Sequence, residues 1–237
     1  MSTLRKILEN TLAGKRSTHS KSSHRAVLFC GAGFSANCLS LYTDDEFGSS
    51  NTLLEKLNSQ LQHKFTNLKN ASEKYIKEFG EHGLLKLLQE NYTVSRVTHD
   101  MIDIVRFPWN AIYTTNYDNA IELALQKADK HPFPVNNIAY DETVITSLKN
   151  NQTPVIYLHG SLSKFDEKNL ESSLVITTGN YHSVASKHQK LFAHLKQDFN
   201  RSDAFVFVGY KLNDFHLQEV FYSPAETKNK TFFINTL

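Results

Sequence analysis

The chain has 237 residues, 40% of them hydrophobic and 21% charged, and a formal net charge of +2 at pH 7. This length is enough for a large core, and the composition is ordinary for a soluble globular protein. The charge argues against a basic nucleic-acid-binding surface, and no window reaches the ~20 apolar residues of a membrane span. The amino terminus lacks the apolar stretch of a signal peptide, and two cysteines make no disulfide framework. We therefore expect a cytoplasmic protein that binds neither nucleic acid nor membranes.

A glycine turn follows the first expected strand. Residues 1–25 are expected to form a short amphipathic helix over residues 3–13 and a polar linker. A buried strand at residues 26–30 then runs into Gly31-Ala32-Gly33-Phe34-Ser35. Glycines let the backbone approach a pyrophosphate, whose charge the N–H groups at a helix start meet. Ala36 replaces the third glycine of the G-x-G-x-x-G pattern, so the turn predicts either a phosphate-binding loop or an unliganded strand-to-helix turn.

A helical segment over about residues 51–106 interrupts the alternation of strands and helices. Leucines recur at helical spacing in its first part, and residues 97–105 are a further helix candidate. Three or more helices exceed a normal crossover between two strands. We therefore interpret the segment as an inserted helical module beside a sheet.

Asn116 and Asp118 follow the second strand, which is expected at residues 111–115. Their spacing places two hydrogen-bonding side chains beyond the end of an apolar strand, where ligands of parallel sheets bind. Asp118 is also suited to cap the helix expected over residues 119–128. Capping explains one of the two residues but not both, so the pair predicts a ligand site.

His159 and Gly160 end the strand that Pro154 introduces. A histidine is a suitable general base near neutral pH, and a glycine beside it leaves room for a ligand. Most lone histidines are structural, but the position of His159 opposite Asn116 sets it apart from the others in the chain. A modest strand over residues 135–140 and a short helix over residues 142–149 are expected before it.

The last part of the chain contains another strand that ends in a glycine. The apolar residues 204–208 run into Gly209 and Tyr210. The chain stops two residues after its last expected strand, without a helix to cover that strand, which we interpret as the sign of a domain from a longer protein. The other elements expected here are a strand at residues 174–178, a helix over residues 183–200 and a strand over residues 231–235 that ends in Asn235.

Taken in order, these motifs resemble those of the sirtuin family. The shared pattern is Gly-Ala-Gly-x-Ser, Thr-x-Asn-x-Asp, His-Gly, a glycine after a buried strand, and Ile-Asn, and it extends over residues 26–235. Two family features are absent: residues 161–208 contain no cysteine for a zinc ribbon, and Gly-Ile-Pro-Asp-Phe-Arg does not follow the glycine turn. The form Trp-Asn-Ala-Ile-Tyr-Thr-Thr-Asn-Tyr-Asp, preceded by Pro108, is similar to the sirtuin-like domains of bacterial anti-phage defence proteins. Those domains degrade NAD and usually stand at the amino end of a longer chain.

The resemblance implies a Rossmann-like α/β fold over residues 26–237, in which a parallel sheet carries the helical module and no zinc ribbon. It implies an NAD+ glycohydrolase that releases nicotinamide and ADP-ribose, with water as the acceptor and without a metal. Such an enzyme is expected to be a regulated effector of anti-phage defence, controlled by homo-oligomerisation, by a partner or by a carboxyl-terminal domain. Two other classes stay open. One is an NAD-dependent protein deacylase or ADP-ribosyltransferase, and the other is a sensor that binds NAD or ADP-ribose without turnover.

The same resemblance implies roles for the site residues. Asn116 would orient the nicotinamide ribose and the attacking water, and His159 would be the base that acts on a ribose hydroxyl or on water. The remaining expected contacts are Gly31, Ala32, Gly33 and Ser35 with the pyrophosphate, Asp118 with the carboxamide, and Gly209, Tyr210 and Asn235 with the adenosine half.

Overall fold

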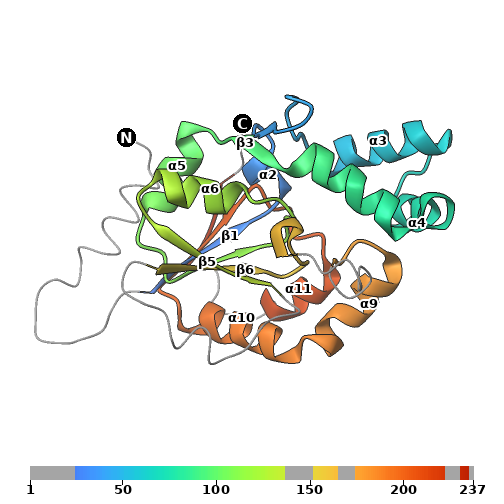
Figure 1. The fold of residues 1–237 in the computed structure, drawn as a ribbon. Coiled ribbons are helices and arrows are strands. Elements are labelled where there is room, and N and C mark those ends of the chain that lie inside the picture. The colour runs from blue at the N-terminus through green and yellow to red at the C-terminus, as the bar shows by residue number, and fades with distance from the viewer. Residues whose placement is uncertain (1–24, 137–151, 165–173, 222–229, 235–237) are drawn as a thin grey trace, which may run out of the picture.

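The computed structural model describes residues 25–136, 152–164, 174–221 and 230–234, and its centre is a parallel β-sheet (Figure 1). The six strands of the sheet are β1 (Ala26–Cys30), β4 (Ala111–Thr114), β5 (His131–Asn136), β6 (Gln152–Tyr157), β7 (Ala204–Val208) and β8 (Thr231–Ile234). They lie in the order β5-β6-β4-β1-β7-β8, and each is parallel to its neighbours. The α/β fold expected from the sequence is confirmed.

The strand order reverses beside β1. From β1 the chain first builds β4, β5 and β6 on one side, and it then returns to build β7 and β8 on the other. The carboxyl end of β1 therefore lies between two loops that lead in opposite directions. In open parallel sheets, ligands bind in the crevice at such a reversal.

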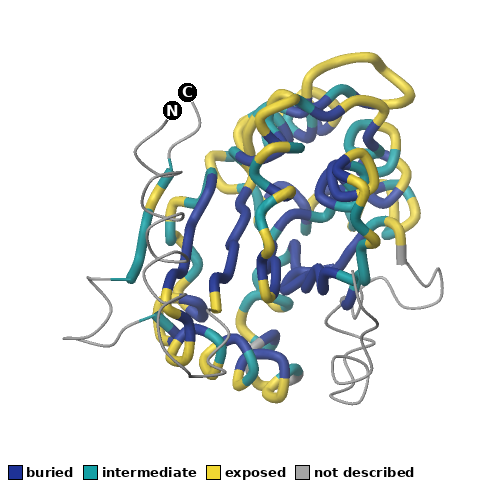
Figure 2. Tube along the Cα trace, turned by 90° about the vertical axis from the view of Figure 1, so that its left-hand side faces the viewer, coloured by how far each residue is buried: buried dark blue, intermediate teal, exposed yellow. Residues whose placement is uncertain are grey.

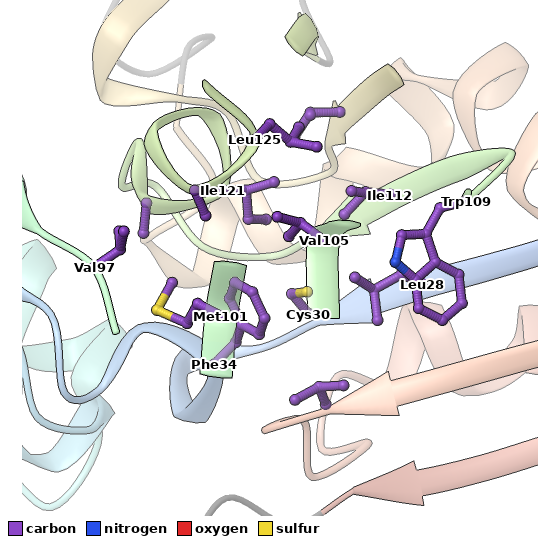
Figure 3. Packing of buried hydrophobic residues seen from close by; sticks show 14 of the residues in the cluster. Leu28, Cys30, Phe34, Val97, Met101, Val105, Trp109, Ile112, Ile121 and Leu125 are labelled. Carbon is purple, nitrogen blue, oxygen red and sulfur yellow. The ribbon is translucent and has the colours of Figure 1, made fainter. Parts of the chain in front are cut away.

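Both faces of the sheet are covered by helices, which explains why β1 and β7 are apolar at every position. Leu28 and Cys30 of β1 pack against α5 and α6, where Figure 3 shows Val105 and Ile121 beside them. Phe29 points to the other face and packs against α10 and α11. β1, β4 and β7 are buried along their whole length (Figure 2). The covering helices are α5 (His99–Arg106), α6 (Ala120–Lys127), α10 (Gln189–Arg201) and α11 (Phe215–Phe221).

The helical part of the segment between β1 and β4, residues 50–92, projects beyond the sheet and has a core of its own (Figure 1). Ser49 caps one of its helices in a capping box with Thr52, and Asn67 caps the next. The longer helix kinks at Gly80, whose φ of 75° no helix interior adopts. A short antiparallel ribbon that the sequence analysis does not foresee also lies here. The elements are β2 (Leu39–Ser40), α3 (Ser50–Leu61), α4 (Leu68–Tyr92) and β3 (Val94–Arg96).

The prediction of a strand at residues 174–178 is wrong. Leu174 and Ile176 are buried there, as strand residues would be, but they pack into the core of the helical segment without pairing. Thr177 then caps α9 (Thr178–Lys187), in a capping box with Asn180. The apolar pattern of these residues therefore reflects their burial against the helical segment and not a place in the sheet.

The helix expected over residues 183–200 consists of two helices, since His188 ends α9 and precedes α10. β5 begins four residues earlier than expected, and its two prolines are tolerated because it is an edge strand. α11 was not expected.

The helices expected over residues 3–13 and 142–149, and Asn235, lie outside the described residues. None of the helices within the described ranges combines the length and apolarity that crossing a membrane requires.

Candidate active site

A cleft with a volume of about 670 Å³ lies at the carboxyl ends of the central strands. The predicted residues that line it are Ala32, Gly33 and Ser35 after β1, Asn116 and Asp118 after β4, His159 after β6, and Gly209 and Tyr210 after β7. Gly31 does not line the cleft, but its carbonyl accepts a hydrogen bond from Asn116. Asn235 lies outside the described residues. A second hollow of about 490 Å³ follows the exposed side of α10 and contains none of the predicted residues. The cleft at the strand ends is therefore the candidate site.

The glycine turn packs directly against the turn after β7. The Gly31 N–H donates to the Val208 carbonyl at 3.0 Å, and the Gly33 N–H donates to the Gly209 carbonyl at 3.0 Å. Gly209 has a φ of 62°, and a Cβ there would lie 2.3 Å from the Phe34 nitrogen. Only glycine allows the two backbones to approach this closely.

Asn116, Ser35 and Asp118 form one chain of buried hydrogen bonds. The Asn116 Nδ2 donates to the Gly31 carbonyl and to Ser35 Oγ, each at 3.0 Å. The Ser35 hydroxyl in turn donates to Asp118 Oδ2 at 2.7 Å. Because the Gly31 carbonyl is able only to accept, the Asn116 nitrogen must face it. The Asn116 Oδ1 is then the polar atom of this side chain that is available to a ligand.

Asp118 has the capping role considered from the sequence and also holds the side chain of Ser35. Its Oδ1 accepts from the Ala120 N–H at 3.0 Å, which supports the start of α6, while its Oδ2 holds Ser35. Burial raises the pKa of Asp118, and the hydrogen bonds from Ser35 and Ala120 oppose that effect. Its carboxylate therefore positions Ser35 and Asn116, and its predicted contact with a carboxamide stays a prediction.

His159 lies at the bottom of the cleft, where it is 2% exposed. Its Nε2 lies 3.2 Å from the Nε2 of His216 in α11, and the ring of Tyr181 packs edge-on against it at 5.2 Å. Burial, and after it the charge of Lys69, lowers the pKa of His159 to about 3. His159 is therefore neutral at physiological pH.

A family model for the SIR2-like domain matches residues 110–233, which is more than half of the chain. The chain belongs to the SIR2-like domain family. The matched range contains Asn116, Asp118, His159 and Gly209, and the assignment to the sirtuin family made from the sequence is confirmed.

Three curated relatives of this SIR2-like domain carry the name NAD(+) hydrolase ThsA. The chain is 24% identical over 200 residues to the protein of Cytobacillus dafuensis, 26% over 200 residues to that of Acinetobacter baumannii (strain 532279), and 25% over 161 residues to that of Enterococcus faecium. These matches cover 82%, 82% and 66% of the chain, but only 37%, 38% and 32% of the relatives. A solved structure from work on the mechanism and regulation of Sir2 enzymes has a TM-score of 0.49 at 17% identity, and it covers 99% of this chain and 86% of that one.

One wall of the cleft in the SIR2-like domain could not be predicted from the sequence. The helical segment supplies an apolar and aromatic surface there, and the start of α3 lies beside it. Helical spacing identified Leu53 only as a core residue, like Leu57, and no local pattern in the sequence singled out the other residues of this wall. The lining residues that were not predicted are Ala36, Phe47, Gly48, Ser49, Ser50, Asn51, Leu53, Leu68, Tyr92, Thr115, Tyr117, Tyr181, Lys211, Asn213 and Asp214.

The described residues hold no group of three or more histidine, cysteine, aspartate and glutamate side chains placed to bind a metal ion. Cys30 and Cys38 are free and buried, and burial raises the pKa of both thiols. The polar side chains that line the cleft are amides, hydroxyls and the imidazole of His159, together with Asp118, Lys211 and Asp214.

The free energy of unfolding is expected to fall as the pH drops below about 6.5, because His159 and His216 then bind protons in the unfolded state but stay neutral in the folded state. The folded pKa is about 3 for His159 and about 4 for His216. Between these folded pKa values and the unfolded pKa of about 6.5, the unfolded state binds more protons than the folded state, so stability rises with pH over that range. Two such groups contribute up to about 2.7 kcal/mol per pH unit near about pH 5.

Urea unfolding at about pH 7 and at about pH 5 measures this loss. The double variant His159→Phe/His216→Phe should lose much less stability between the two values than the wild type does. Replacement of the half-buried His194 by Phe, on the outer side of α10, is the matched control and should follow the wild type. Equal losses in the double variant and the wild type would contradict the prediction.

Proposed function

We propose that this SIR2-like domain is an NAD+ glycohydrolase, which cleaves NAD+ to nicotinamide and ADP-ribose. The observation that carries the proposal is the fixed orientation of Asn116, whose Oδ1 is left for a ligand in the same cleft as His159. The names of the three relatives support the same activity, since each is an NAD(+) hydrolase.

The proposed reaction suits these side chains. Breaking the bond between nicotinamide and ribose develops positive charge at the anomeric carbon, and nicotinamide leaves as a neutral molecule because its ring is cationic in NAD+. A strong general acid is therefore not needed. The protein has to place one water, exclude the rest and stabilise the developing charge. Asn116 Oδ1 accepts a hydrogen bond from the attacking water, while His159 contacts that water or a ribose hydroxyl.

The substrate is proposed to lie across the reversal of strand order. The turn from Gly31 to Ser35 would meet the pyrophosphate, and Gly209 and Tyr210 would meet the adenosine half. Tyr210 is held for this by its hydroxyl, which donates to Asp214 at 2.8 Å. No step of the proposed reaction requires a metal.

We further propose that the domain is a cytoplasmic effector of anti-phage defence whose activity is held in check. An NAD+ hydrolase that was always active would deplete the host cofactor, so a partner, a further domain or self-assembly would have to restrain it. This part rests on the curated relatives, of which the chain spans less than two fifths.

Incubation of the protein with NAD+, followed by chromatography, is expected to show equal amounts of nicotinamide and ADP-ribose. His159→Ala should abolish both products, whereas His194→Ala should retain them because His194 contacts Tyr113 and Asp198 away from the cleft. Nicotinamide release only in the presence of an acyl-lysine peptide would instead identify a deacylase. Titration of NAD+ by calorimetry completes the test: binding without turnover would identify a sensor, and no binding would refute the proposal.

A further inference from the structure

His216 lies directly behind His159 and outside the lining of the cleft. The two Nε2 atoms are 3.2 Å apart, and both side chains are buried, with 2% and 3% exposure. We propose that His216 is a positioning residue that donates its Nε2–H to His159, so that His159 presents Nδ1–H to the cleft as a hydrogen-bond donor. This inference rests on the proposed function and specifies what His159 does in it.

The direction of the hydrogen bond follows from the other nitrogen of His216. Its Nδ1 is buried and has no partner among the described residues. If His159 were the donor, neutral His216 would carry its proton on that Nδ1, as a buried N–H without an acceptor. With His216 as the donor, Nδ1 carries only a lone pair. Buried N–H groups without a partner are rarer in proteins than unsatisfied acceptors, which favours the second arrangement.

The surroundings keep both imidazoles neutral, which is the condition for a single shared proton. Lys69 of α4 lies with its Nζ 3.6 Å from the centre of the Tyr181 ring, and that ring packs edge-on against both histidines. Burial first, and then the neighbouring His159, lowers the pKa of His216 to about 4, against the opposing effect of the Asp214 carboxylate. An imidazolium in either position would meet the Lys69 charge in a site with little water.

If His159 is a hydrogen-bond donor, Asn116 and His159 have different roles in the cleft. Asn116 offers an acceptor, Oδ1, which suits a hydrogen of the attacking water. His159 offers a donor, Nδ1–H, which suits an oxygen of the ribose hydroxyls. A neutral donor also avoids placing a positive charge beside the cation that forms on the sugar. In this arrangement His159 orients the ribose and is not the base predicted from the sequence.

The tautomers are measured on the free protein, by long-range ¹H–¹⁵N spectra of ¹⁵N-histidine-labelled protein at about pH 7, with signals assigned by single replacement. The expected result is a proton on Nδ1 of His159 and on Nε2 of His216. In His216→Phe, the His159 signals should shift to a mixture of tautomers. A proton on Nε2 of His159 in the wild type, or unchanged His159 signals in His216→Phe, would overturn the inference.

Kinetics separate positioning from a structural role. His216→Phe should lower kcat for NAD+ by about 100-fold through misplacement of His159, with KM little changed because His216 does not line the cleft. Its effect on stability should be small, because the variant loses the donor to His159 Nε2 but also removes the unpartnered buried Nδ1. His216→Gln, whose amide reaches the place of Nε2, should recover most of kcat, and His182→Phe on the exposed surface of α9 is the control.

Equal kcat values for His216→Phe and the wild type would overturn the positioning role. So would an equal loss in His216→Gln and His216→Phe, since the hydrogen bond would then not be what matters. If the wild type cleaves no NAD+, the proposed function fails, and the spectra of the free protein still decide whether the histidine pair exists as inferred.

Discussion

Asn116→Ala is expected to reduce NAD+ cleavage by about 100- to 1,000-fold while the protein stays folded. The variant loses Oδ1, the acceptor proposed to hold the attacking water, and the loss of one preorganised polar contact at a reacting centre typically has an effect of this size. It also leaves the Gly31 carbonyl without its Asn116 partner, which costs about 1–3 kcal/mol of stability. Product chromatography measures the first effect and urea unfolding the second.

Asn110→Ala is the matched control for this prediction. Asn110 directly precedes β4, at the amino end of the strand, where its Oδ1 accepts from the Ala26 N–H at 2.9 Å. Its loss should cost a similar stability and leave turnover intact, because the site lies at the opposite end of the strand. Near-normal cleavage by Asn116→Ala, or equal losses of activity in both variants, would refute the role proposed for Asn116.

Gly209→Ala is expected to weaken NAD+ binding by more than tenfold and to destabilise the protein by about 2–5 kcal/mol. The new Cβ would lie 2.3 Å from the Phe34 nitrogen and 2.4 Å from the Gly33 carbonyl carbon, both of which are backbone atoms. The glycine turn must therefore move away from the turn after β7, and the hydrogen bond from Gly33 to Gly209 is lost. Calorimetric titration of NAD+ and thermal unfolding give the two quantities.

Gly80→Ala separates this contact from backbone strain alone. Gly80 has a φ of 75°, comparable with the 62° of Gly209, but a Cβ at Gly80 meets nothing within 4 Å. It should cost only backbone strain, about 1–3 kcal/mol, because a φ of 75° with a ψ of 168° is almost confined to glycine, and it should leave NAD+ binding unchanged. Identical behaviour of the two variants would show that the packing of the two turns does not matter.

The strand ends could be predicted because each rests on a local pattern. The apolar residues of β1 and β7 are continuous because both faces of those strands are covered, and each pattern stops where polar residues begin. Since the carboxyl ends of parallel strands share one edge, the proximity of Asn116 and His159 followed from the pattern alone. Leu174 and Ile176 show the limit of that reasoning, because residues buried against a helical core give the same apolar sequence pattern as residues buried in a sheet.

Local sequence thus determined the α/β class and the cleft-lining residues at the strand ends, since hydrophobic periodicity and glycine positions are properties of neighbours in the chain. Only the tertiary structure decided which partners those residues have. Ser35 and Asp118 are 83 residues apart, and His159 and His216 are 57 apart, yet each pair is within hydrogen-bond distance. No local pattern encodes such pairs, because they arise when strand order and helix packing bring distant segments to the same edge of the sheet.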